Sequence, residues 1–235
     1  KRREKLFFRC CFSRFKKSFQ FINRIKRETS WYPGYYHEID NYRCSNYYPY
    51  LGEFLFNSPY IMLPVGDLPR MKDFIIKTLS PISEQIFVRP DRGDKIWAGQ
   101  VIAANRLDEG IKYIKVYEVD DNEIAVCATA KTIAREWRIV VGDGEIIGYT
   151  QYQPINSSDC PDEVLEYARK IIDVGFAPDK VWTMDICQDM KNDLYLMEIG
   201  GFSCAGLYHA NAKTIVENVS RIALQEWEDA YGGCD

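Results

Sequence analysis

Apolar residues recur with two different periods along this chain, and the period changes near residue 100. Before that point, Met71, Ile75 and Leu79 fall on one face of a helix expected over residues 68–79. Asp67 precedes this segment and is expected to cap it. Short apolar runs predict flanking strands at 60–64 and 86–89.

After residue 100 the pattern predicts mostly strands. Gly142, Asp143 and Gly144 favour a tight hairpin turn, because Gly and Asp tolerate the positive φ that such turns need. Asp159 is expected to cap the first of two later helices. The predicted strands are 112–118, 124–128, 136–141, 145–151, 181–187 and 194–199, and the predicted helices are 161–174 and 211–229. Antiparallel strands with interspersed helices indicate an α+β fold.

Two acidic residues stand opposite each other in the last predicted hairpin. Asp185 and Glu198 are equally far from a turn centred between Lys191 and Asn192, so strand alternation puts both on one face. Like charges across a ladder repel each other, and a divalent cation between the carboxylates would offset the repulsion. A different register, or an arginine that neutralises the acids in a salt bridge, would explain the pattern equally well.

Cationic residues precede this pair in two segments. Arg89 ends a predicted strand and Lys95 follows in a glycine-containing loop, where both could reach phosphate oxygens or simply face solvent. Glu136 and Arg138 alternate onto one strand face, and Arg138 could bind a phosphate, a substrate carboxylate or a cross-strand acid. The glycine-rich segment 200–208 is either a tight turn or a loop that a ligand approaches closely.

Composition and charge narrow the functional classes. The 235 residues suffice for one large domain, or for one domain with a small companion. The net charge is −4, yet residues 1–28 hold eleven Lys or Arg and two Glu, a balance of +9. This segment also has helical apolar spacing, so it is either a packed amphipathic helix or an arm that contacts RNA or an anionic membrane. Scattered cysteines and the lack of a long apolar run favour a cytoplasmic protein.

Three segments, in their order and spacing, resemble the ATP-grasp ligases, in particular the short RimK-related group of phages and bacteria. The likeness covers residues 31–230. The segments are FVRPDRGDKIWAGQV, TAKTIAREWRIVVGDGEIIGYTQY and VWTMDICQDMKNDLYLMEIGGFSCAGLY. The family usually has Asn two residues after the second acid, where this chain has Gly200, and the wider superfamily commonly has lysine at the position of Arg89.

The resemblance implies an ATP-grasp fold, in which two α+β lobes with mostly antiparallel sheets clasp a nucleotide and the N-terminal region is reduced. Residues 1–30 would form a basic amphipathic segment, 31–85 a small N-terminal region and 86–235 the catalytic domain. The implied site consists of Arg89 and Lys95 on the ATP phosphates, Ala128, Thr129, Ala130 and Lys131 at the adenine hinge, Glu136 and Arg138 in catalysis, and Asp185 and Glu198 on Mg²⁺.

The implied reaction is phosphorylation of a carboxylate by ATP, followed by attack of an amine or thiol on the acyl phosphate. It needs no side-chain nucleophile, and His37 and His209 are isolated and interpreted as structural. Small-molecule or peptide carboxylates and amines would be the substrates, and Tyr47, Tyr48, Tyr152 and Tyr208 either line the acceptor pocket or pack in the core. The alternative is a catalytically weak nucleotide-binding module that recruits RNA, membrane or protein through its basic N-terminal arm.

Overall fold

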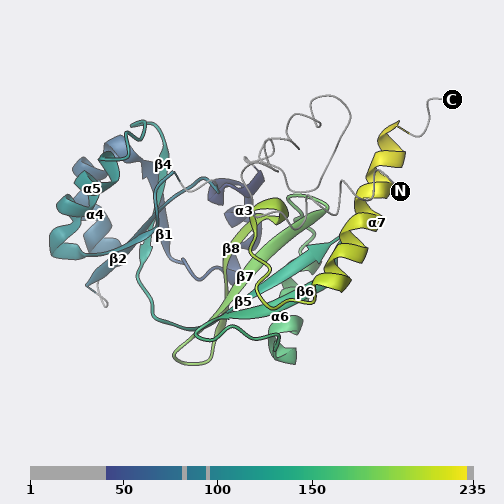
Figure 1. The fold of residues 1–235 in the computed structure, drawn as a ribbon. Coiled ribbons are helices and arrows are strands. Elements are labelled where there is room, and N and C mark those ends of the chain that lie inside the picture. Colours follow the sequence, from purple (N-terminus) through teal and green to yellow (C-terminus); the bar gives the residue numbers. More distant parts are fainter. Residues whose placement is uncertain (1–40, 81–83, 94–95, 232–235) are drawn as a thin grey trace. The chain divides into compact units, whose positions relative to one another are not determined.

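The computed structural model describes residues 41–80, 84–93 and 96–231 (Figure 1). The amphipathic segment expected within residues 1–30, together with His37 and Lys95, lies outside these ranges. Contacts between Cα atoms divide the described chain into two compact units. The N-terminal unit comprises residues 41–134 and 187–197, and the C-terminal unit comprises 135–186 and 198–231. The sequence-based division into residues 1–30, 31–85 and 86–235 remains a prediction.

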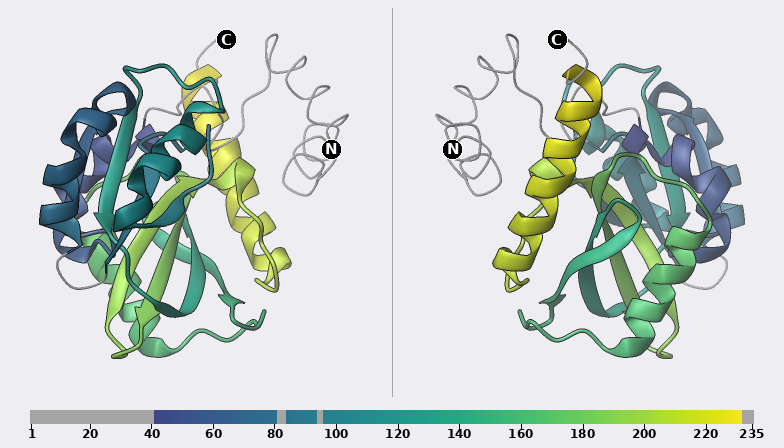
Figure 2. Two further views of the ribbon diagram at one scale, coloured as in Figure 1. Left: turned by 90° about the vertical axis from the view of Figure 1, so that its left-hand side faces the viewer. Right: turned by 90° about the vertical axis from the view of Figure 1, so that its right-hand side faces the viewer.

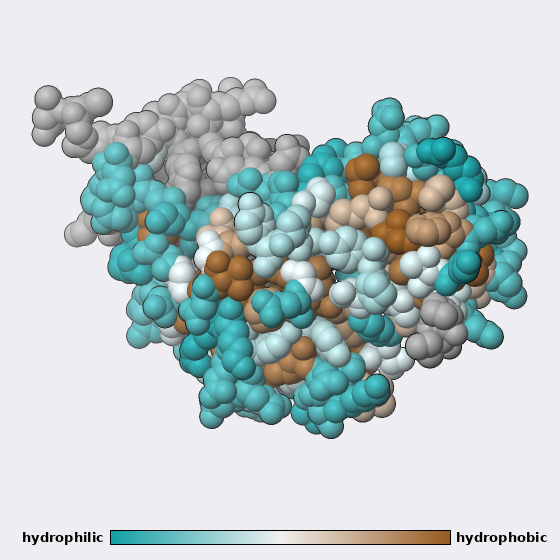
Figure 3. Space-filling model, turned by 180° about the vertical axis from the view of Figure 1, so that it is seen from behind, coloured by the Kyte–Doolittle hydropathy of each residue, from teal (hydrophilic) through white to brown (hydrophobic). Residues whose placement is uncertain are grey.

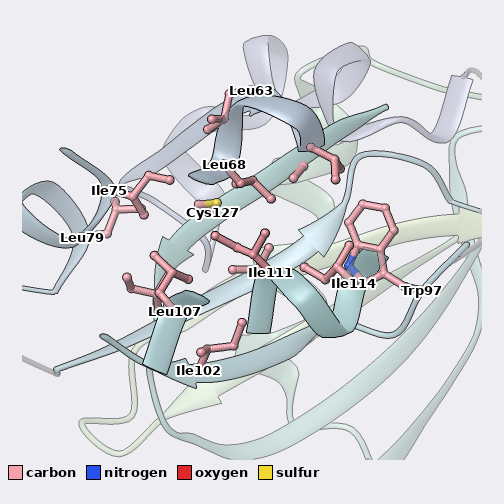
Figure 4. Close-up of a cluster of buried hydrophobic side chains, with 14 residues drawn as sticks. Leu63, Leu68, Ile75, Leu79, Trp97, Ile102, Leu107, Ile111, Ile114 and Cys127 are labelled. Atoms are coloured by element: carbon pink, nitrogen blue, oxygen red, sulfur yellow. The ribbon is translucent and has the colours of Figure 1, made fainter. Parts of the chain in front are cut away.

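The N-terminal unit is built on an antiparallel sheet with the strand order β1-β4-β2-β3. Two helices pack on this sheet through a buried apolar cluster that includes Leu68, Ile75 and Ile111 (Figure 4). The elements of this unit are α3 Cys44–Leu51, β1 Tyr60–Pro64, α4 Leu68–Leu79, β2 Gln85–Pro90, β3 Gln100–Ala103, α5 Leu107–Lys115 and β4 Ile124–Thr129, with 3-10 turns at Gly52–Phe54, Val65–Asp67 and Ala104–Arg106.

The strand predicted over residues 112–118 is wrong, because most of this segment belongs to helix α5. Leu107, Ile111 and Ile114 lie on the buried face of α5 at helical spacing, and this longer period overrides the local alternation after residue 111. Gly110 lets the helix approach β3, since a side chain at that position would collide with Ile102. Helix α3 and strand β3 were not predicted.

Neither expected helix cap makes its capping hydrogen bond. Asp67 occupies the N-cap position of α4, but its carboxylate accepts a hydrogen bond from Arg70 Nε at 2.8 Å. Helix α6 begins after Pro161, and Asp159 instead accepts a hydrogen bond from the Ser157 hydroxyl. The polar residue before each helix correctly marked the helix boundary. In both cases, however, its carboxylate bonds to a nearby side chain instead of to an N–H of the first helical turn.

The C-terminal unit is organised around a sheet with the strand order β6-β5-β7-β8. Helices α6 and α7 lie on opposite faces of this sheet (Figure 2). The elements are β5 Ile133–Gly142, β6 Glu145–Gln153, α6 Asp162–Asp173, β7 Val181–Asp189, β8 Leu194–Gly201 and α7 Ala212–Tyr231, with a 3-10 turn at Phe202–Cys204. The two-residue turn between β5 and β6 is as predicted, because Asp143 and Gly144 have φ of 54° and 80° and Gly142 pairs with Glu145.

Helix α7 packs on the sheet through Ile215, Val219 and Ile222, which meet Val140 and Ile147. The close packing of α7 on the sheet requires a glycine in β6, because a Cβ at Gly148 would lie 2.6 Å from Ile215.

We therefore expect Gly148→Val to destabilise the protein by about 1–3 kcal/mol, the usual range for overpacking. Urea denaturation measures this loss. Gly52→Ala is the matched control, since a Cβ there meets nothing within 4 Å, and equal stabilities of the two variants would contradict the prediction.

The described part of the chain contains no helix that is both long and apolar enough to cross a bilayer. Seen from behind, hydrophilic residues are spread over the described surface with apolar residues between them (Figure 3).

Candidate functional site

The Arg138–Asp185 ion pair is the centre of the candidate site. Arg138 on β5 donates from Nε to Asp185 Oδ1 at 2.8 Å and from Nη2 to Oδ2 at 2.7 Å. Only 14% of the Arg138 side chain and 5% of the Asp185 side chain are exposed, so this bidentate pair is largely shielded from water. The sequence left open whether Arg138 shares a sheet face with the acids, because this depends on strand order, and the structure places β5 beside β7 and the arginine on Asp185.

Glu198 on β8 lies near Asp185 on the neighbouring strand β7. The Thr183 hydroxyl donates to the Gly200 carbonyl at 3.1 Å, and this contact fits the register in which Asp185 faces Glu198. The negative charge of Glu198 also contributes to the raised pKa of Asp185. The two carboxylates that the sequence singled out are therefore electrostatic neighbours, and Glu198 is partly exposed.

Glu136 and Tyr152 extend the cluster on the same face. The Tyr152 hydroxyl donates to Glu136 Oε2 at 2.5 Å and lies 3.3 Å from Asp185 Oδ2. Sequence reasoning considered Tyr152 for an acceptor pocket or for core packing, and missed its bonds to the acids. The pairing of Arg138 with Thr150 puts Tyr152, two residues on, on the face of Arg138. Counting from the turn would have paired Arg138 with Tyr149, and only the irregularity between Val140 and Val141 shifts the register by one residue, so the sequence carried no signal for this placement.

Burial and mutual repulsion shift the ionisation of these groups. Desolvation raises the pKa of Asp185, the charge of Glu198 adds to the shift, and the bonds and charge of Arg138 oppose it. Desolvation also raises the pKa of Glu136, against the Tyr152 hydrogen bond and together with the charges of Asp185 and Glu198. Burial lowers the pKa of Arg138, but the hydrogen bonds and the charge of Asp185, together with the neighbouring tyrosines, raise it further than burial lowers it, so Arg138 stays cationic.

The raised pKa of Glu136 predicts a pH-dependent stability. The folded protein holds the Glu136 proton more tightly than the unfolded chain, so this contribution falls as the pH rises from about 4.5, the ordinary value, through the folded pKa. We expect Glu136→Gln to gain stability relative to the wild type as the pH is raised from 5 to 8. Urea denaturation at both pH values measures the gain, and a constant difference between the two proteins would refute it.

Two tyrosines pack beside the guanidinium of Arg138. Tyr152 and Tyr208 stack with their ring centroids 5.2 Å apart and their planes at 11°. The guanidinium carbon of Arg138 lies 5.4 Å and 5.5 Å from the two centroids, within cation–π range. Tyr47 and Tyr48, in contrast, are core residues of the N-terminal unit with 1% of their surface exposed. The four tyrosines therefore separate into a core pair and a site pair.

The donor set fits a magnesium ion that takes part of its coordination from a nucleotide. In the part of the chain that the structure describes, no three Asp, Glu, His or Cys side chains cluster closely enough to hold a metal ion by themselves. Magnesium commonly binds through only one or two carboxylates, with substrate phosphates and water completing its octahedron. Glu136, Asp185 and Glu198 can carry more negative charge than Arg138 alone neutralises, so a bound cation would offset the excess.

The remaining predicted residues lie in the N-terminal unit. Arg89 is buried with 8% of its surface exposed, whereas Lys95 lies outside the described residues. Ala128 is fully buried between its strand partners Tyr60 and Phe87, so only its backbone could contact a ligand. His209 is exposed, and its backbone N–H donates to Thr150 Oγ1 at 3.4 Å.

The three residues after Ala128 lead out of strand β4. The Thr129 hydroxyl donates to the Leu79 carbonyl at 2.7 Å, and the Ala130 N–H donates to the Gln85 carbonyl at 3.3 Å. Lys131 Nζ donates to the carbonyls of Phe56 and Ser58, each at 2.6 Å. Burial lowers the pKa of Lys131. These bonds fix the strand end that the resemblance assigned to the adenine hinge, and a role in adenine binding remains a prediction.

Asp91 has a structural role that the sequence did not reveal. It lies in the cationic segment around Arg89, but its buried carboxylate accepts hydrogen bonds from the Ser45 N–H at 2.6 Å and the Ser45 hydroxyl at 2.9 Å. Asp91, in the bend that follows β2, thereby caps the N-terminus of α3 and fixes the residues next to Arg89.

Comparison with known proteins agrees with this architecture. Residues 70–218, more than half of the chain, match the family model described as ATP-grasp domain, R2K clade family 2. A search of the curated proteins gave no significant match.

Several solved structures have a similar fold. The ligase PsnB, solved with precursor peptide PsnA2 and AMPPNP, has a TM-score of 0.56 at 13% identity over 88% of this chain and 68% of its own. The D-alanyl-alanine synthetase A of Vibrio cholerae gives 0.54 at 14%, over 77% and 63%. A RimK-domain ATP-grasp protein of Sphaerobacter thermophilus gives 0.55 at 10%, over 77% and 65%. This chain thus spans about two thirds of these proteins, and such identities show the fold alone. By its family match, the chain belongs to the R2K clade of the ATP-grasp superfamily and has the ATP-grasp ligase fold.

Proposed function

We propose that this protein is an ATP-dependent ligase that joins a carboxylate to an amine or thiol through an acyl phosphate. The observation that carries the proposal is the shielded Arg138–Asp185 pair with Glu136 and Glu198 beside it, on one sheet face of an ATP-grasp domain. Several acids around one arginine suit a site that binds a metal-complexed nucleotide.

In the proposed reaction, a substrate carboxylate oxygen attacks the terminal phosphorus of ATP and ADP leaves. The amine nitrogen or thiol sulfur then attacks the acyl carbon, phosphate leaves, and the attacking group loses its proton. Asp185 and Glu198 would hold Mg²⁺, which when bound neutralises phosphate charge. Arg138 would direct its planar fork at a phosphate or carboxylate oxygen, with Glu136 facing nucleotide or substrate.

The N-terminal unit is proposed to contribute nucleotide contacts. Arg89 and Lys95 would bind ATP phosphates, and residues 128–131 would contact adenine. The likeness to PsnB, which was solved with a precursor peptide, supports testing peptides as well as free amino acids as substrates.

Amine-dependent ADP release tests the proposal. The full chain is incubated with Mg-ATP and a mixture of amino acids and short peptides, ADP is measured, and coupled products are sought by mass spectrometry. We expect ADP only when carboxylate and amine are both present, and loss of this activity in Glu198→Gln. Glu163→Gln, an exposed acid on α6, is the matched control. A wild type that binds AMPPNP but never releases ADP would overturn the proposal.

That outcome would favour a second candidate, a catalytically weak nucleotide-binding module. Gly200 supports it, because it supplies no side-chain ligand where the family usually has Asn. The backbone does not dictate this glycine, since a Cβ at position 200 would meet only Thr183 Oγ1, at an ordinary 3.4 Å. We expect Gly200→Asn to fold normally, and a gain of ADP release in this variant would identify the missing ligand as the defect.

A further inference from the structure

Both carboxylate oxygens of Asp185 are engaged in hydrogen bonds. Arg138 Nε is bonded to Oδ1 and Arg138 Nη2 to Oδ2, and the Tyr152 hydroxyl lies 3.3 Å from Oδ2. Only 5% of the Asp185 side chain is exposed. A cation that chelates both oxygens of this carboxylate would occupy the side that the fork of Arg138 now holds, and would displace its two N–H groups.

Arg138 has contacts that do not depend on Asp185. Its Nη1 donates to the Gly206 carbonyl at 3.2 Å, and its guanidinium packs beside the rings of Tyr152 and Tyr208. If the bonds to Asp185 break, these contacts can keep the guanidinium in the cluster instead of releasing it to solvent.

The segment that provides two of these contacts has a strained backbone. Tyr208 has φ of 45°, a left-handed conformation that bulky residues rarely adopt. The ring stack with Tyr152 and the bond from the His209 N–H to Thr150 Oγ1 hold it there. Strain maintained next to a charged cluster is typical of functional segments.

We propose that a divalent cation and Arg138 exchange on Asp185, and that Tyr208 is a positioning residue that holds Arg138 after the exchange. In the structure, Asp185 is neutralised by its own arginine. Cation binding frees Nε and Nη2 of Arg138, which can then bind an anionic oxygen of a substrate. This proposal rests on the metal assignment of Asp185 and Glu198 made above.

Mn²⁺ binding without nucleotide tests the exchange, followed by electron paramagnetic resonance in the wild type and in Arg138→Lys. Lysine keeps the positive charge but loses the two-pronged fork, so one Asp185 oxygen becomes available. We expect Arg138→Lys to bind Mn²⁺ about fivefold more tightly than the wild type. Arg135→Lys, an exposed position on the same strand, is the matched control and should not change the affinity.

The Arg138 Nε–H resonance gives a second readout, by ¹H–¹⁵N NMR with Mg²⁺ and AMPPNP. We expect this resonance, identified by its loss in Arg138→Lys, to shift when the cation binds. In Tyr208→Ala, but not in Tyr208→Phe, the shifted signal should broaden towards that of a solvent-exposed arginine, because phenylalanine retains the stack.

The outcomes separate the two proposals. Mn²⁺ binding with equal affinity in the wild type and Arg138→Lys, together with an unmoved Nε–H signal, would overturn the exchange and leave the metal assignment intact. Mn²⁺ binding that Glu198→Gln does not weaken, or no Mn²⁺ binding in any variant, would overturn the metal assignment and the exchange with it.

Discussion

Replacing Asp185 with asparagine is expected to lower ADP formation by a factor on the order of 10²–10³, the loss typical when one preorganised group that stabilises transition-state charge is removed. Asparagine keeps the size of the side chain and can still accept a hydrogen bond from Arg138, but it lacks the charge that a magnesium ligand needs. The measurement is ADP release under saturating Mg-ATP and the substrate mixture, with thermal unfolding measured in parallel.

Asp193→Asn is the matched control for this substitution. Asp193 lies in the same β-hairpin, exposed in the turn between β7 and β8, so the same chemical change there should leave ADP release unaffected. Asparagine at position 185 with activity within tenfold of the wild type would show that Asp185 is a structural partner of Arg138 and not a metal ligand.

Removing Arg138 should have the largest effect on stability. Arg138→Met leaves Asp185 buried without its counter-charge, and loss of one partner from a buried ion pair costs about 3–5 kcal/mol. Urea unfolding is the measurement. Arg135→Met is the control, because this arginine is exposed on the same strand and its loss should change stability by less than about 0.5 kcal/mol.

A double variant separates the cost of the unpaired charge from the value of the pair. Arg138→Met combined with Asp185→Leu removes both charges, and apolar replacement of a buried pair is often neutral in stability. We expect the double variant to recover most of the lost stability and to have no ligase activity. A double variant as unstable as Arg138→Met would mean that the lost packing of Arg138 on Tyr152 and Tyr208 dominates.

The sequence predicted most elements of the fold because their signals are local. The turn at Asp143 and Gly144 and the helix over residues 68–79 follow from the properties of a few adjacent residues. The segment 112–118 was mispredicted because its alternation agrees with a strand, and only packing of Ile111 and Ile114 against the sheet selects the helix.

The candidate site was accessible from the sequence only where a hairpin limits the geometry. Asp185 and Glu198 belong to neighbouring strands joined by a short turn, so counting from the turn gave their relation. Arg138 and Asp185 are 47 positions apart, and nothing local indicates that β5 lies beside β7. The capping of α3 by Asp91 is non-local in the same way.

The sequence by itself therefore determined the α+β class, the family and the paired acids of the last hairpin, since these depend on short-range periodicity and motif order. The tertiary structure alone decided which charge neutralises Asp185, which tyrosines join the site and which pack in the core. Those choices depend on strand order and on the burial of charge, which are set by contacts between residues distant in the chain.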